Sequence, residues 1–209
     1  DQGRFTSDTR IRVTLPTLEQ ALAQGAKKLV LMSHTGRPGG RVNPAFSLNI
    51  AYEKLKELIA EVKGNPVLAK QFPNLAKLSN SDLEFLDQSI TQQGLAPKTR
   101  ARVARSPARI RMLENLRFCP FEEENEGIFA QALAGLGDFY INDAFGTAHR
   151  AHASTARIAE FAPRVAAGLL MEKEVTYLGL ALDPDLVILG GSKVSDKLPI
   201  INNLLERMR

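Results

Sequence analysis

One stretch decides how the fold of this chain is interpreted: LVLMSHTGRPGG, residues 29–40. Its apolar beginning, residues 29–32, predicts a short buried strand. The polar remainder predicts a loop, because its turn residues end the strand and its glycines let the backbone approach a ligand closely. Ligands of α/β sheets usually lie at the carboxyl ends of the strands, and this loop is in that position.

Helices are expected on both sides of this strand. Before it, Pro16 suits a first helical turn and Gly25 suits a helix stop, so a helix is predicted between them. After it, Ser47 is a candidate cap, and apolar residues recur at helical spacing from Leu48 to Val62 beside charged residues. This second segment is predicted to be an amphipathic helix.

Strands and helices continue to alternate along the chain, which predicts an α/β fold with a parallel sheet. The strands are predicted at residues 110–116, 139–141 and 186–189, and the helices at residues 128–136 and 171–182. No strand is expected between residues 64 and 109. There, Ser81 followed by Glu84 resembles a capping box and predicts a helix through about Gln93.

The positive charge of the chain is concentrated in one stretch. The formal net charge is +4, while residues 98–111 carry six basic side chains and no acidic one, so the remainder is slightly acidic. No aromatic side chains are interleaved to stack on bases. The stretch is therefore interpreted as a solvated surface, and nucleic-acid binding is not expected.

Composition argues against disulfide-stabilised and membrane-spanning proteins. Cys119 is the single cysteine, so no internal disulfide or Cys/His zinc site can form, and it is predicted to be a small buried residue in a reducing compartment. No apolar stretch approaches the roughly 20 residues of a spanning helix, and nothing near the start resembles a cleaved leader. The chain is expected to be soluble and cytoplasmic.

Five segments follow one another in an order typical of a single family. The longest is NDAFGTAHRAH at residues 142–152, supported by AGLLMEKE at residues 167–174. The others are DTRIR at residues 8–12, MSHTGRP at residues 32–38, ENLRF at residues 114–118 and GGSKVSDK at residues 190–197. In these segments, which span nearly the whole chain, the sequence resembles the phosphoglycerate kinase family.

The resemblance implies a two-domain enzyme of glycolysis that transfers a phosphoryl group between ATP and the carboxylate of 3-phosphoglycerate. It implies a Rossmann-like substrate domain at residues 1–170 that lacks its first strand, an interdomain helix at residues 171–184, and the first βα unit of a second α/β domain at residues 185–209. The adenine pocket and the magnesium carboxylate of the family are expected to lie outside this chain. The 209-residue chain alone is therefore predicted to be inactive.

The motif loops agree with that substrate. A phosphorylated three-carbon acid carries about three negative charges, and arginine forks match phosphate and carboxylate oxygens. By resemblance, the substrate would be bound by Arg10, His34, Thr35, Gly36, Arg37, Arg117 and Arg150. Arg10 would also stabilise the moving phosphoryl group. His149 and His152 are interpreted either as contributors to the positive field or as packing histidines.

A nucleotide site is predicted where the strand at residues 186–189 meets a helix N-terminus through small residues, which suits phosphate binding. The spacing is not that of a Walker A loop. By resemblance, the nucleotide would be bound by Gly191, Ser192, Lys193 and Lys197, with Lys193 acting on the transferred phosphoryl group. Phosphoryl transfer needs mainly positioning and cations. The resemblance implies that Arg10 and Lys193 are the catalytic residues. ATP/ADP with Mg²⁺ is the expected cofactor, without metal ligands in this chain, and a monomer is expected.

One alternative remains open. A non-catalytic module of kinase ancestry would keep the anion-binding loops and use the basic stretch at residues 98–111 as a contact surface for assembly. The retained set of cationic motif residues favours the enzyme.

Overall fold

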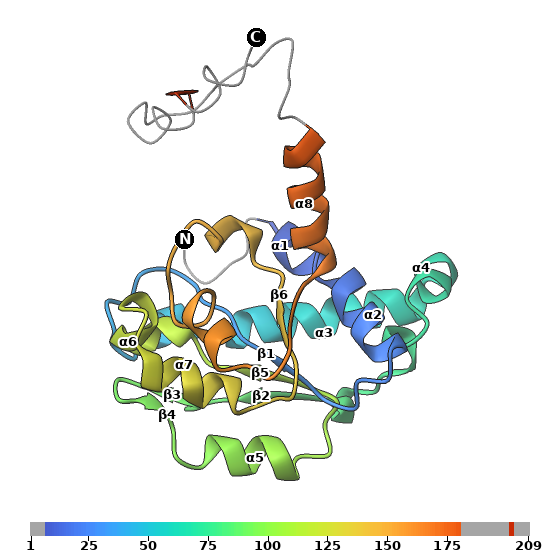
Figure 1. The fold of residues 1–209 in the computed structure, drawn as a ribbon. Helices are drawn as coiled ribbons and strands as arrows, with labels where there is room; N and C mark the ends of the chain where they lie inside the picture. Colours follow the sequence, from blue (N-terminus) through green and yellow to red (C-terminus); the bar gives the residue numbers. More distant parts are fainter. Residues whose placement is uncertain (1–6, 181–200, 203–209) are drawn as a thin grey trace.

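The computed structural model describes residues 7–180 and 201–202 of the chain. Figure 1 shows a body of strands and helices from which helix α8 (Leu169–Leu180) extends. The strand predicted at residues 186–189 and the glycine loop after it lie outside the described residues.

The described residues contain seven strands in three sheets. Their bounds are β1 (Leu29–Leu31), β2 (Leu83–Leu86), β3 (Ile90–Thr91), β4 (Gly94–Leu95), β5 (Ile110–Leu113), β6 (Tyr140–Asn142) and β7 (Val165–Ala167). β1, β5 and β2 are parallel neighbours in this order, β6 and β7 form a second parallel pair, and β3 and β4 form an antiparallel hairpin. The predicted parallel α/β architecture is confirmed, and β1, β5 and β6 occur where strands were expected.

The helices also agree largely with the predicted ones. The remaining α-helices of the described residues are α1 (Thr9–Arg12), α2 (Leu15–Ala23), α3 (Asn49–Gly64), α4 (Pro66–Gln71), α5 (Thr99–Arg105), α6 (Pro120–Glu123) and α7 (Gly127–Ala134). The 3₁₀ helices are η1 (Pro44–Phe46), η2 (Leu75–Lys77), η3 (Asn80–Asp82), η4 (Leu116–Phe118), η5 (Phe145–Thr147) and η6 (Arg157–Glu160). α2, α3, α7 and α8 lie at the predicted positions. Within the described ranges, no helix has both the length and the apolar character that crossing a membrane requires.

Strand β5 is buried on both faces because its alternate side chains enter two different cores. Ile110 and Met112 belong to a cluster formed with α2 and α3. Leu113 belongs to a second cluster, formed with α7 and the segment after β5. Cys119 lies in this second cluster and is buried as predicted, and burial raises the pKa of its thiol. With both faces of the sheet covered, the loops at the strand ends are the places where a ligand can reach it.

The segment between residues 64 and 109 differs from its prediction. The helix expected after Ser81 is replaced by β2 and the β3–β4 hairpin. The capping box is formed instead by Ser79 and Asp82, and it closes only the single turn η3. From Leu83 onward the side chains alternate between the two cores, which is the period of a strand. The helix prediction was wrong because burial of alternate residues outweighs a local cap signal.

The basic stretch at residues 98–111 is only partly a solvated surface. In α5, Arg102 forms ion pairs with Glu84 and Asp87 at 2.9 and 2.8 Å. The end of the stretch enters β5, where Arg111 is 0% exposed. The prediction was wrong for Arg111, because the central strand of a covered sheet buries both of its faces.

Asp143 fixes the start of α8. Its carboxylate accepts hydrogen bonds from the Leu170 backbone N–H at 2.9 Å and from the Thr17 hydroxyl at 2.6 Å, and Thr17 in turn accepts one from the Leu169 N–H at 3.0 Å. Gly168 is required beside it, because a Cβ there would lie 2.3 Å from Asp143 Oδ1. α8 therefore begins slightly before its predicted start and is fastened to α2 and to the end of β6. The division of the chain into domains stays a prediction.

Candidate functional site

Four side chains converge beyond the carboxyl ends of parallel strands. His34 and Arg37 follow β1, Arg117 follows β5 and Arg150 follows β6. The charges of Arg117 and Arg150 both act on His34, and those of Arg37 and Arg150 act on Arg117, so the four groups are near neighbours. We call these four residues the cationic cluster. It lies where the rule for parallel sheets predicts a ligand.

Asn115 holds the loop after β1 in place. Its side-chain amide donates hydrogen bonds to the Thr35 and Phe46 carbonyls, both at 2.8 Å, and its Oδ1 accepts one from the Arg117 backbone N–H at 3.0 Å. Asn115 is itself 0% exposed. One buried side chain thus ties the loop after β1 to the segment after β5. The Thr35 carbonyl is engaged by Asn115, and a contact between the Thr35 backbone and the substrate stays a prediction.

Gly36 makes the closest approach in this loop. Its φ is +62°, in the left-handed region, and a Cβ at this position would lie 2.3 Å from the Phe46 ring. Its carbonyl accepts a hydrogen bond from Arg117 Nη1 at 2.9 Å. The glycine expected from the sequence is therefore required, but the groups it approaches are Phe46 and Arg117. A contact between Gly36 and the substrate stays a prediction.

Arg117 is the buried member of the cationic cluster. Its side chain is only 5% exposed, and its Nε lies 3.3 Å from Glu123 Oε1. Burial lowers the pKa of Arg117, Glu123 opposes this effect, and the neighbouring charges of Arg150 and Arg37 lower the pKa further. Arg117 therefore positions the loop after β1 in addition to supplying charge. Arg37 is exposed and Arg150 is half-buried, so these two are the more accessible arginines.

The three histidines have different environments. Burial, reinforced by the charge of Arg117, lowers the pKa of half-buried His34 to about 4, so His34 is neutral at neutral pH. His152 is 7% exposed, and burial lowers its pKa as well. His149 is exposed and accepts a hydrogen bond from Arg150 Nε at 3.2 Å. The structure supports the packing interpretation for His152, and His34 contributes a neutral imidazole.

Sequence reasoning missed the buried polar residues that support the site. Glu114 accepts a hydrogen bond from the Leu48 N–H at 2.8 Å, which joins the segment after β5 to the start of α3. Glu122 is buried, which raises its pKa, and it accepts hydrogen bonds from the Ser154 N–H at 3.1 Å and the Ser154 hydroxyl at 2.6 Å. Glu114 and Asn115 lie in the motif ENLRF, next to the predicted substrate contact Arg117. Polar residues beside such a contact were the sequence signal that could have identified these supporting residues.

Two predicted parts of the site are not joined to the cationic cluster by the described contacts. Arg10 is exposed on α1, which packs against α3. Gly191, Ser192, Lys193 and Lys197 lie outside the described residues. Among the residues that the structure describes, no group of His, Cys, Asp and Glu side chains is suited to hold a metal ion. What the cluster offers chemically is anion binding by fixed cations placed around a neutral histidine.

Comparison with known proteins shows which family the sequence is similar to. The family model for phosphoglycerate kinase matches residues 1–209. Phosphoglycerate kinases of Chloroflexus aurantiacus and Acidobacterium capsulatum are 44% and 43% identical to the chain, over 100% of its length and 47% and 48% of theirs. The chain thus spans about half the length of the curated relatives it matches.

Solved structures agree with the sequence comparison. The phosphoglycerate kinase of Coxiella burnetii has a TM-score of 0.72 at 32% identity, covering 100% of this chain and 46% of that one. The phosphoglycerate kinase of Pyrococcus horikoshii OT3 has a TM-score of 0.71 at 28% identity, covering 99% of this chain and 47% of that one. Family model, relatives and fold agree, and the chain belongs to the phosphoglycerate kinase family.

Proposed function

We propose that the protein is a phosphoglycerate kinase that transfers a phosphoryl group reversibly between ATP and the carboxylate of 3-phosphoglycerate in glycolysis, and that this chain provides the 3-phosphoglycerate site. The observation that carries the proposal is the convergence of the cationic cluster at the strand ends of a family member. A ligand with one phosphate and one carboxylate matches several fixed cations far better than a neutral ligand does.

Within this proposal the residues of the cationic cluster have different roles in substrate binding. Arg37 and Arg150, the more accessible arginines, bind the oxygens of the substrate, and neutral His34 donates or accepts a hydrogen bond without adding charge. Arg117 adds positive field and holds the Gly36 carbonyl, so that the loop is preformed before the substrate arrives. Preformed loops reduce the entropy that binding costs.

The catalytic assignments rest on the family alone. Arg10 and Lys193 stabilise the transferred phosphoryl group, the Thr35 backbone contacts the substrate, and Gly191, Ser192 and Lys197 bind the nucleotide phosphates. ATP/ADP with Mg²⁺ supplies and accepts the phosphoryl group, with magnesium ligands outside this chain. The protein then acts as a cytoplasmic, ATP-binding monomer without a nucleic-acid or membrane partner.

Calorimetric titration of 3-phosphoglycerate tests the substrate site. We expect binding that weakens with added salt, because exposed charges are screened. Replacing Arg37 or Arg150 by alanine should weaken binding by on the order of 2 kcal/mol, roughly 30-fold, as for a lost charge-assisted contact. Lys63→Ala, which removes an exposed charge from α3, is the matched control and should change affinity little. Unchanged affinity in both arginine variants would contradict the assignment.

A coupled turnover assay separates the enzyme from a non-catalytic module. The full-length protein should turn over, and Lys193→Ala should lower kcat much more than it weakens substrate binding, because the lysine acts mainly in the transition state. The 209-residue chain alone should not turn over, since proximity lowers the barrier only when both substrates are held. A full-length protein that binds 3-phosphoglycerate without turnover would favour the non-catalytic module.

A further inference from the structure

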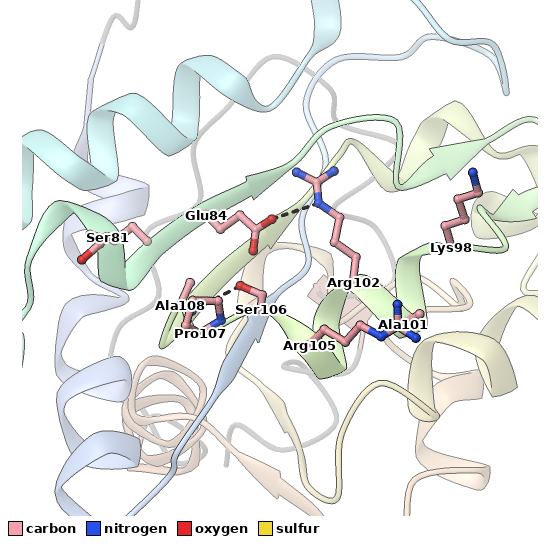
Figure 2. A pocket seen from close by; sticks show the side chains of 10 residues that line it. Ser81, Glu84, Lys98, Ala101, Arg102, Arg105, Ser106, Pro107 and Ala108 are labelled. Carbon is pink, nitrogen blue, oxygen red and sulfur yellow. Dashed lines mark hydrogen bonds and ion pairs between the residues drawn. The ribbon is translucent and has the colours of Figure 1, made fainter.

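A second basic site lies at the end of the sheet opposite the cationic cluster. A pocket of about 780 Å³ opens between α5 and the amino ends of β2 and β5 (Figure 2). Its wall is apolar where Leu83, Ala101 and Ala108 line it. Since the cationic cluster follows the carboxyl ends of the parallel strands, the two sites are separate.

The positive charges around this pocket are only partly neutralised. Figure 2 shows Arg102 bonded to Glu84, at 2.9 Å, and Glu84 is the acidic residue among those that line the pocket. Lys98 and Arg105 also line it, and neither forms an ion pair with another residue of the described ranges. Two cations are therefore available to an anion that enters.

A buried arginine behind the pocket is an independent observation. Arg111 of β5 is 0% exposed and in register with Glu84 of β2, and its Nη2 donates a hydrogen bond to the carbonyl of Ser106, which lines the pocket. Nε and Nη1 of Arg111 have no hydrogen-bond partner among the described residues, and neither has Glu84 Oε2. Burial lowers the pKa of Arg111, although Glu84 opposes the effect. A buried cation with unsatisfied donors is costly unless an anion or water pairs with it.

Helix α5 is a thin cover over this arginine. It is 7 residues long, and its buried residues are Thr99 and Val103. Arg102 fastens α5 to Glu84 and Asp87, and Thr99 donates a hydrogen bond to the Ser89 carbonyl, so α5 stays in place over the sheet. Arg111 therefore acts on a ligand in the pocket through its positive charge and through the Ser106 carbonyl that it holds.

We propose that the pocket under α5 binds a phosphate monoester of an apolar group, with the phosphate held by Lys98 and Arg105, the buried charge of Arg111 behind it, and the apolar group on the wall beside Leu83. Pockets for small ligands combine an apolar lining with a few placed polar groups, and this one has that composition. A nucleic acid fits less well, because no aromatic side chain lines the pocket to stack on bases.

Titration of phenyl phosphate followed by NMR tests the proposal. The amide signals of α5 and of the amino end of β5 should shift. Inorganic phosphate and benzyl alcohol should each bind more weakly than phenyl phosphate, since the first has only the phosphate and the second only the apolar ring. Lys98→Gln with Arg105→Gln should weaken phenyl phosphate binding at least about tenfold, or about 1.4 kcal/mol. Lys63→Gln with Lys70→Gln, two exposed lysines on α3 and α4, is the matched control and should leave it unchanged.

Three results would overturn the proposal. The first is equal phenyl phosphate affinity in the Lys98 and Arg105 variant and in the control, and the second is NMR shifts confined to the cationic cluster. The third is single-stranded RNA that binds more tightly than phenyl phosphate and loses its binding in the Lys98 and Arg105 variant. Saturating 3-phosphoglycerate should not displace phenyl phosphate. The proposal for the pocket and the proposed function are thus tested separately, and either can be refuted while the other holds.

Arg111→Met tests the buried anchor. Thermal unfolding should show little change in stability, because removal of a buried cation with unsatisfied donors offsets loss of its hydrogen bond to the Ser106 carbonyl. Affinity for phenyl phosphate should fall about tenfold while that for benzyl alcohol stays the same. Unchanged phenyl phosphate affinity would show that Arg111 does not contribute to binding and would remove it from the site. If this variant does not fold, the Lys98 and Arg105 variant decides.

Discussion

Replacement of Asn115 by alanine is expected to destabilise the protein and to release the loop after β1 from its place in the cationic cluster. The side chain is 0% exposed and makes three hydrogen bonds, to the Thr35 and Phe46 carbonyls and from the Arg117 N–H. Each bond contributes about 1 kcal/mol net, and the buried groups left behind lose their partners. The free energy of unfolding should therefore fall by about 3 kcal/mol.

The assay is thermal and urea unfolding, with calorimetric titration of 3-phosphoglycerate on the same samples. For a chain of this size the loss corresponds to a fall in Tm of roughly 6–12 °C. Affinity should weaken at least about tenfold, because binding must then order the loop that Asn115 holds. Asn115→Asp should do no better than alanine, since a carboxylate cannot donate to the Thr35 and Phe46 carbonyls.

Asn65→Ala is the matched control. Asn65 is exposed and caps α4 by accepting from the Val67 and Leu68 N–H groups, so its loss should cost about 1 kcal/mol and leave anion binding intact. If Asn115→Ala loses no more stability than Asn65→Ala, the buried amide does not hold the loop and the reasoning is refuted.

Two further predictions concern the same loop. Gly36→Ala should lower the free energy of unfolding by about 1–3 kcal/mol more than Gly39→Ala does, as measured by urea unfolding. Both glycines have positive φ, +62° and +65°, but only a Cβ at Gly36 would meet Phe46, at 2.3 Å. Equal losses in the two variants would contradict this reasoning. The pKa of His34 is about 4 when folded and 6.5 ordinarily, so its contribution to stability is present above about pH 6.5 and is lost as pH falls toward 4. His34→Gln should therefore reduce the fall in stability over that pH range, and an unchanged pH profile would argue against a buried neutral imidazole.

The elements that could be predicted from the sequence are those whose signal is local. β1 is a run of apolar residues that ends in a turn-rich loop, and α3 repeats its apolar residues at helical spacing from Leu48 to Val62. Alternation of such units implies a parallel sheet, and a parallel sheet places the motif loops together at one end. For that reason the convergence of Arg37, Arg117 and Arg150 beside His34 could be expected before the structure was known, whereas the described contacts do not join Arg10 to them.

The environment of each site residue could not be predicted in this way. The side chain of Arg117 is 5% exposed, and its polar partners are the Gly36 carbonyl in the loop after β1 and Glu123 in α6. Its charge and the burial of His34 together lower the pKa of that histidine. Burial and pKa depend on groups that are distant in sequence, so no single motif carries this information.

By itself, then, the sequence determined the parallel α/β order, the helices with a clear apolar period and the residues that supply positive charge. Only the tertiary structure decided that residues 83–86 form a strand and that Arg111 is buried. Pairing of β2 with β5 gives both strands backbone hydrogen bonds and places Leu83 and Leu86 in opposite cores, which outweighs the local signal for a helix. The same central position of β5 encloses Arg111, although its basic neighbours in the chain favour a solvated surface.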